Sequence, residues 1–410
     1  MGLPSQILAR ATHTGSLTTT RNTSYLLTSP TSCFHSNHRG LSPRTSYGQA
    51  TARFQSTRPN AAICKFINVV SFIGKSVSEE ELLQSAHRRR QRPTGFGKWV
   101  EKEKMQWAEI NFKSHPGNHP PPQYERLTNS GHDWWFINHS NRHPANSTYL
   151  GVADGVGGWA EDGNDPAEVS QGIMFHADQL LKNQSIQQQN ESPASLLSRA
   201  FQKTLKDDQV GGGASTALIA QLDPTTATLH WANLGDSSMI HIKSGAHQVG
   251  TRTKAQTHYF NCPYQLTKFP AGYPTQNFVT DTPEMADSGK VALKDGDLVL
   301  LFTDGVGDNL WTEEILTLIR AELKKKPTWD DHILTEEIRS LLALVDEPTM
   351  DDYSFINNLA HKICWSARQA SFQENRSTPI EAEAVKNGIT DLKGGKPDDI
   401  TLVLSLVRFL

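Results

Sequence analysis

The first 78 residues of the chain contain no aspartate or glutamate, although six arginines and two lysines lie among their many serines and threonines. This composition is typical of a mitochondrial transit peptide, since acidic side chains would oppose import driven by the membrane potential. A disordered tail is the alternative, but such a tail would seldom exclude acids over so long a stretch. The segment 52–56 resembles a matrix-protease cleavage site, so we expect residues 1–54 to be removed and the protein to be mitochondrial, in the matrix.

Paired cysteines and long apolar runs are also missing. The four cysteines include no CxxC pair, which argues against a disulfide framework and against a zinc site. The apolar run 67–73 is far too short to span a bilayer. The formal net charge of -3 gives no general electrostatic reason for nucleic-acid binding. We therefore expect no membrane span and no nucleic-acid partner.

The composition predicts where the folded domain begins. Residues 55–124 hold a basic run at 87–92 and a proline cluster at 120–122. Such runs are typical of a solvated helix end and of a stiff spacer, so we interpret 55–124 as an N-terminal extension or linker. The folded domain is then predicted over residues 125–410.

The pattern within that domain mixes strands and helices. Strand-like runs occur at 134–137 and 148–153, and two helices begin at Asp165-Pro166 and Ser192-Pro193, where a capping side chain precedes a first-turn proline. Further strands are predicted at 214–222, 226–233, 238–243, 298–302 and 400–408, the first three as an antiparallel meander, with three or four helices over 312–388. These elements fit an α+β fold, a four-layer αββα sandwich of two antiparallel sheets flanked by helices.

Four short acidic segments adjoin the strand-like runs. They are 153–159 (ADGVGGW), 233–237 (NLGDS), 303–308 (TDGVGD) and 396–401 (KPDDIT). A single Asp-Gly is only a turn signal, but four such segments at strand ends predict that their carboxylates converge. We expect no compensating lysine or arginine among them. Because converging carboxylates repel one another, the economical partner is a hard divalent cation with oxygen ligands.

The order of ADGVGGW, GGGASTAL, ANLGDS, FTDGVGD and PDDIT resembles the metal-dependent protein serine/threonine phosphatases of the PP2C type. The match is closest to their mitochondrial, PTC7-like branch, whose first motif reads Asp-Gly-Val-Gly-Gly-Trp. The resemblance covers about residues 125 to 408. It implies the same αββα fold and the hydrolysis of phosphoserine and phosphothreonine by a metal-activated water, without a phospho-enzyme.

The resemblance also implies a set of metal ligands. Asp154 would bridge two Mn²⁺ or Mg²⁺ ions, the carbonyl of Gly155 would bind one of them, and Asp304 and Asp398 would complete the catalytic site. Asp236 and Asp308 match the positions that contribute to a weaker third ion. For these two, an Asx turn and a helix cap are the alternative interpretations. Asp399 stands where many relatives have asparagine and would support a neighbouring ligand, although the sequence leaves open which of Asp398 and Asp399 binds the ion.

Three features depart from that pattern or stay open. His132 replaces the first of two acids upstream of the first motif, which leaves Asp133 as the carboxylate that could bind the metal directly or through water. Val156 replaces a histidine that has been considered a general acid. The segment 211–216 could cradle a phosphate, but it lacks the lysine of a P-loop, so close packing near the metals is the favoured interpretation.

We thus expect a monomeric enzyme that acts on phosphorylated proteins. The alternative from another class is a catalytically weak or inactive binding module, which His132 and Val156 would favour. The acidic residues Asp154, Asp304 and Asp398 favour catalysis. A hydrolase of small phosphoesters would share this chemistry and differ only in its substrate.

Overall fold

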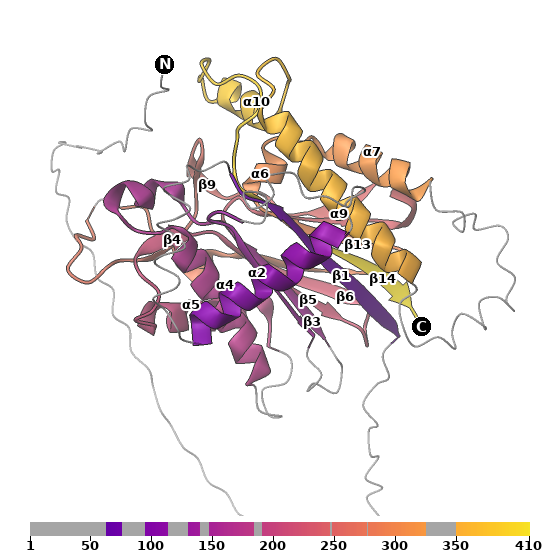
Figure 1. Cartoon of the computed structure of the whole chain (residues 1–410), viewed down its shortest axis with the longest axis horizontal. Coiled ribbons are helices and arrows are strands. Elements are labelled where there is room, and N and C mark those ends of the chain that lie inside the picture. Colours follow the sequence, from indigo (N-terminus) through magenta and orange to yellow (C-terminus); the bar gives the residue numbers. More distant parts are fainter. Residues whose placement is uncertain are drawn as a thin grey trace, which may run out of the picture. The chain divides into compact units, whose positions relative to one another are not determined.

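The computed structural model describes residues 63–75, 95–113, 130–139, 147–183, 191–246, 248–276, 278–324 and 350–410. Its strands form two five-stranded antiparallel sheets that lie between helices (Figure 1). The expected transit peptide, the basic run 87–92 and the proline cluster 120–122 lie outside the described residues. None of the helices within the described ranges is long and apolar enough to cross a membrane.

The first sheet contains both the first and the last strand of the described chain. Its order is β1 (Cys64–Ile73), β14 (Ile400–Phe409), β13 (Leu298–Phe302), β7 (Ser238–Ile242) and β8 (Val249–Arg252). β1 and β14 pair antiparallel along their whole length, from Cys64 opposite Phe409 to Ile73 opposite Ile400. Helix α9 (Met350–Ser371) packs on β1 and β14, and α7 (Thr312–Leu323) lies beside α9.

The second sheet carries its own pair of helices. Its order is β12 (Asp287–Ala292), β6 (Thr228–Leu234), β5 (Ala217–Asp223), β3 (Thr148–Ala153) and β2 (Trp134–His139). α4 (Ala167–Lys182) packs on β2 and β3, and α5 (Pro193–Lys206) packs on β5 and β6. α2 (Gly95–Lys113) contacts both α4 and β1. The shorter elements are β4 (Gly213–Ser215), β9 (Thr257–Tyr259), β10 (Cys262–Pro263), β11 (Leu266–Lys268), α6 (Asp304–Gly307), α10 (Pro379–Lys386) and the 3₁₀ turns Gly157–Asp162, Ser244–Ala246 and Pro283–Met285.

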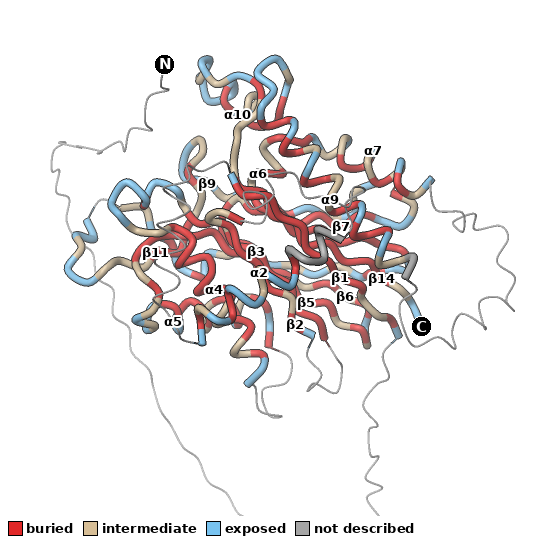
Figure 2. The backbone as a smooth tube through the Cα atoms, in the orientation of Figure 1, coloured by how far each residue is buried: buried red, intermediate tan, exposed pale blue. Residues whose placement is uncertain are grey.

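The core lies between the sheets, whose central strands are buried along most of their length, whereas the edge strands β8 and β12 are not (Figure 2). Trp135 of β2 stacks on Phe72 of β1, with ring centroids 4.4 Å apart, and on Trp134 at 4.7 Å. The ring pair Phe72–Trp135 joins the two sheets, because β1 and β2 belong to different ones. Two sheets with helices outside them confirm the predicted αββα sandwich.

Two local predictions were wrong. The domain does not begin near residue 125, because β1 and α2 come from the segment that we interpreted as a linker. The three-strand meander is also broken: β5 pairs with β6, but β7 pairs with β13 and β8 in the other sheet. The chain changes sheets at Gly235, whose φ of 108° lies in a region that favours glycine.

The predicted start at Ser192 agrees with the structure, whereas the helix predicted from Asp165 begins one residue later than expected. The Ser192 hydroxyl accepts a hydrogen bond from the Ser195 backbone N–H (3.2 Å), and Pro193 opens α5. Pro166 is the N-cap of α4 and offers no capping side chain, and the Asp165 carboxylate accepts a hydrogen bond from the Ala167 N–H (3.1 Å) one residue before the cap. The Ser192 cap satisfies a backbone donor that a helix leaves unpaired.

Candidate metal centre and active site

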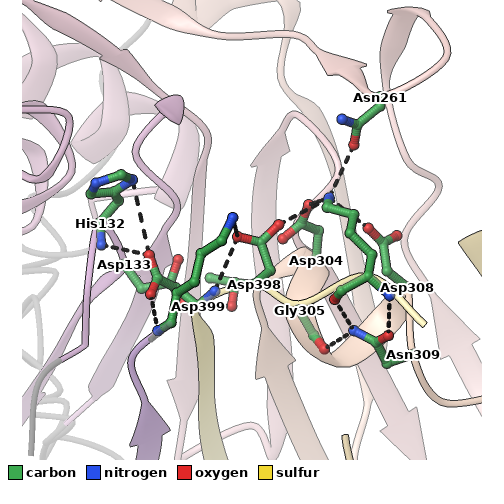
Figure 3. Close-up of polar contacts among 12 residues, drawn as sticks. His132, Asp133, Asn261, Asp304, Gly305, Asp308, Asn309, Asp398 and Asp399 are labelled. Carbon is green, nitrogen blue, oxygen red and sulfur yellow. Dashed lines mark hydrogen bonds and ion pairs between the residues drawn. The ribbon is translucent and has the colours of Figure 1, made fainter. Parts of the chain in front are cut away.

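Seven aspartates gather at one edge of the sandwich. Trp134 at the start of β2 pairs with Ala153 at the end of β3, and Phe302 at the end of β13 pairs with Leu402 near the start of β14. Antiparallel pairing therefore places the residues before β2 and β14 beside those after β3 and β13. Figure 3 shows several of these carboxylates in one row, among them Asp133, Asp304 and Asp398. The seven are Asp133, Asp154, Asp236, Asp304, Asp308, Asp398 and Asp399.

The backbone of Asp154 is fixed on both sides by the Gly-rich segment. Its N–H donates to the Thr216 hydroxyl (3.0 Å), and its carbonyl accepts from the Ser215 hydroxyl and the Thr216 N–H, both at 2.9 Å. The Gly211 N–H donates to Glu168 Oε2 (2.6 Å). The described contacts of segment 211–216 are thus those of close packing beside Asp154, as the sequence favoured.

Gly155 lies where a side chain has no room. A Cβ at this position would be 2.3 Å from the carbonyl oxygen of Pro166. The Gly155 N–H donates to the His132 carbonyl (3.2 Å), and Gly155 forms an isolated bridge with Ser215. The first motif is therefore held against the start of α4 and the turn before β2.

A lysine lies inside the acidic cluster, so our expectation that no cation compensates it was wrong. Lys396 Nζ is 2.6 Å from Asp304 Oδ2, 2.8 Å from Asp308 Oδ2 and 3.0 Å from Asp398 Oδ2. Burial would lower the pKa of the Lys396 ammonium, but the three carboxylates outweigh it and raise that pKa. The sequence could have indicated this cation, because Lys396 lies two residues before Asp398 in the last acidic segment.

Asp398 and Asp399 differ in what their carboxylates contact. Asp399 is buried and accepts the His132 N–H (2.8 Å) and the Lys75 N–H (2.5 Å), so it ties the end of β1 to the turn before β2. Asp398 faces Lys396, and its Oδ1 is 3.9 Å from Lys75 Nζ. Burial raises the pKa of Asp398, but these two lysines more than offset it and leave that pKa below its usual value.

Two carboxylate oxygens of the cluster lack a partner among the described residues. Asp133 Oδ2 accepts from the Thr303 hydroxyl (2.7 Å), whereas its Oδ1 is buried without a hydrogen bond. Asp236 Oδ1 is buried and unpartnered as well. Burial, then neighbouring carboxylates, raises the pKa of both groups. Unpartnered buried oxygens in an acidic environment are the ligands that a hard divalent cation would accept.

Asp308 does not cap the next helix, which corrects one of the alternatives from the sequence. Its carboxylate faces Lys396, and the Trp311 N–H at the start of α7 instead donates to Glu314 Oε2 (2.9 Å). Burial raises the pKa of Asp308 to about 7, although Lys396 opposes the shift.

The oxygen atoms at this edge are of the chemical type that a hard divalent cation prefers as ligands. They are carboxylate oxygens, two of them orphaned, at a glycine that allows close backbone approach. Within the described residues, no group of three or more His, Cys, Asp or Glu side chains is already arranged so that it could hold a metal ion. Asp304, Asp308 and Asp398 are instead turned toward the Lys396 ammonium.

Neither departure from the expected motif supplies an acid to the cluster. His132 contributes its backbone N–H to Asp399 and its carbonyl to Gly155, while its Nδ1 is 3.9 Å from Asp399 Oδ2. Val156 has no titratable group. The charged side chains described at this edge include the aspartates, Lys396 and Lys75.

Two of three comparisons with known proteins find similar phosphatases. No protein-family model matches the chain. The human protein named "Protein phosphatase PTC7 homolog" is 34% identical over 260 residues, which cover 63% of this chain and 74% of that protein. The Drosophila ananassae "Protein phosphatase PTC7 homolog fig" is 33% identical over 278 residues, 68% of this chain and 74% of that protein. The X-ray structure of the photosystem II phosphatase PBCP is 26% identical with a TM-score of 0.52 and covers 71% of this chain and 98% of that one.

Proposed function

Because the chain belongs to the PTC7 family of PP2C-type protein serine/threonine phosphatases, we propose that it hydrolyses phosphoserine and phosphothreonine in mitochondrial proteins with bound Mn²⁺ or Mg²⁺. One observation carries the proposed metal dependence. Seven aspartates from distant parts of the sequence meet at one edge of the sandwich, and two of them present oxygens with no partner in the described residues.

The residues that would hold the ions are Asp154, the Gly155 carbonyl, Asp304 and Asp398, with Asp133 as a further oxygen donor. When bound, the divalent ions supply an acidified water and offset negative charge on the phosphoryl group. The chain's own part is to hold the carboxylates in place. Ser215 and Thr216 fix the backbone of Asp154, and the Thr303 hydroxyl holds one oxygen of Asp133.

Phosphate release from a phosphothreonine peptide by the full-length chain tests this function. We expect turnover in Mn²⁺ or Mg²⁺ and its loss in EDTA. Folded protein without turnover in either metal would support the binding module. Turnover of small phosphoesters with none of the peptide would support the small-molecule hydrolase.

Asp398 and Asp399 are expected to have separable roles. Asp398→Asn should weaken Mn²⁺ binding by about tenfold or more, as for metal ligands and their close partners. Asp399→Asn should mainly reduce stability, by about 1–3 kcal/mol, because an amide NH₂ would face one of the two N–H donors that the carboxylate now accepts. Calorimetric Mn²⁺ titration and denaturant unfolding of both variants measure the two effects. The opposite pattern would make Asp399 the ligand.

The acid-free N-terminus supports a mitochondrial location. Residues 1–54 fused to a fluorescent protein should direct it to mitochondria. Replacement of the five arginines of this segment by glutamine should abolish the targeting, because import requires positive charge. A wild-type fusion that stays in the cytosol would contradict the location without affecting the proposed enzymatic activity.

A further inference from the structure

We propose that the Lys396 ammonium is a built-in cation that takes the place of a third divalent metal ion beside Asp308. The inference rests on the proposed metal-dependent function and concerns the same site. The resemblance to PP2C phosphatases had led us to expect a weaker third ion at Asp236 and Asp308. In this chain the Asp308 carboxylate already forms an ion pair with the Lys396 ammonium.

The contacts of Lys396 are those of an ion bound by a polyanionic site. Nζ lies within 3.0 Å of one oxygen each of Asp304, Asp308 and Asp398, and 3.0 Å from Asn261 Oδ1 (Figure 3 labels these four partners). A lone ammonium would lose several kcal/mol on leaving water, so its burial requires such partners. Conversely, the three carboxylates would repel one another without a cation.

The backbone holds Lys396 in this position. Asn309 Oδ1 accepts the Lys396 N–H and Asn309 Nδ2 donates to the Lys396 carbonyl, both at 2.9 Å. Asn309 Nδ2 also donates to the Gly305 carbonyl (2.9 Å). The same asparagine thus connects the Lys396 backbone to the segment that carries Asp304 and Asp308.

Binding of substrate phosphate is the rival role for this lysine. An ammonium has three N–H donors, and four acceptors already surround Nζ. The Lys396 side chain is only 18% exposed, whereas that of Lys75, the other lysine at the cluster, is 50% exposed, and its Nζ lies 3.9 Å from Asp398 Oδ1. The contacts therefore favour a structural cation at position 396 over a group that takes up phosphate.

The test is the number of Mn²⁺ ions bound by the full-length chain, measured by equilibrium dialysis and metal analysis. Lys396→Met removes the charge and keeps a similar length, so this variant should bind one more Mn²⁺ per chain than wild type. Lys396→Arg keeps a cation and should bind the wild-type number. Lys75→Met, the matched control at the same cluster, should also bind the wild-type number.

Asp308→Asn in the wild-type background gives an answer even if Lys396→Met does not fold. If Asp308 holds the lysine, this variant keeps the wild-type number of ions, and a loss of one ion would overturn the inference. An unchanged number in folded Lys396→Met would also overturn it. Wild-type protein that binds Mn²⁺ leaves the proposed function standing in either case, whereas wild-type protein that binds none would overturn both.

Discussion

Asp154→Ala is expected to lower the rate of phosphopeptide hydrolysis by about three orders of magnitude or more. The reason is that bound metal provides several kcal/mol of transition-state stabilisation, and each 1.36 kcal/mol is worth about tenfold in rate. The substitution removes the carboxylate proposed to contact both ions. Phosphate release in saturating Mn²⁺ measures the effect.

The same variant should not be destabilised when metal is absent. The Asp154 backbone is held by Ser215 and Thr216 through atoms that alanine retains. Burial, followed by the carboxylates of Asp304 and Asp133, raises the pKa of Asp154 well above 3.8. A raised carboxyl pKa means that the folded state keeps a proton that the unfolded state releases, so metal-free wild type loses stability as pH rises above about 4. Asp154→Ala removes this carboxyl group, so the part of the stability loss that Asp154 causes should be absent from the variant.

The control for the loss of turnover is Glu161→Ala. Glu161 is an exposed carboxylate seven residues after Asp154, outside the cluster, and its removal should leave turnover unchanged. If Asp154→Ala kept more than a tenth of the wild-type rate, Asp154 would not hold the catalytic metal. If it unfolded in the absence of metal, its lost activity would carry no information about chemistry.

Trp135→Ala should lower the free energy of unfolding by about 3–5 kcal/mol, the range for a buried aromatic side chain. Trp135 is fully buried and stacks on Phe72 and Trp134. Its loss leaves a cavity where the two sheets meet at β1 and β2. Denaturant unfolding at constant Mn²⁺ concentration measures the difference.

Trp365 of α9 provides the matched control because it is 40% exposed. Trp365→Ala should change the free energy of unfolding by about 1 kcal/mol or less, as for other surface substitutions. Equal effects of the two substitutions would mean that the Phe72–Trp135 contact does not join the sheets in solution.

The sequence predicted the parts of this protein that depend on local pattern. The helix start at Ser192 is encoded by a capping side chain followed by proline and appears in the structure, and α4 begins within two residues of the predicted Asp165. The acidic segments could be placed at strand ends because an apolar run adjoins each one. Antiparallel pairing then brings them to one edge, as the pairs Trp134–Ala153 and Phe302–Leu402 show.

The errors concern contacts between distant residues. The run 67–73 has an apolar strand pattern, but nothing near it reveals β14 as its partner. Likewise, β6 and β7 follow each other with a short turn, and only Gly235 with its positive φ marks the change of sheet. Lys396 was visible in its motif, but its ion pairs with Asp304 and Asp308 span about ninety residues and require the fold.

The ties between β1 and the acidic motif that precedes β14 also make the site depend on two distant parts of the chain. Lys75 and Asp399 are 324 positions apart, yet the N–H of one is bonded to the carboxylate of the other. A chain that ends before residue 396 contains Asp154 and Asp304 but lacks Lys396, Asp398 and Asp399. In such a chain Asp304 lacks its lysine partner, and β1 lacks its neighbouring strand β14. We therefore expect chains that are truncated before β14 to lack phosphatase activity.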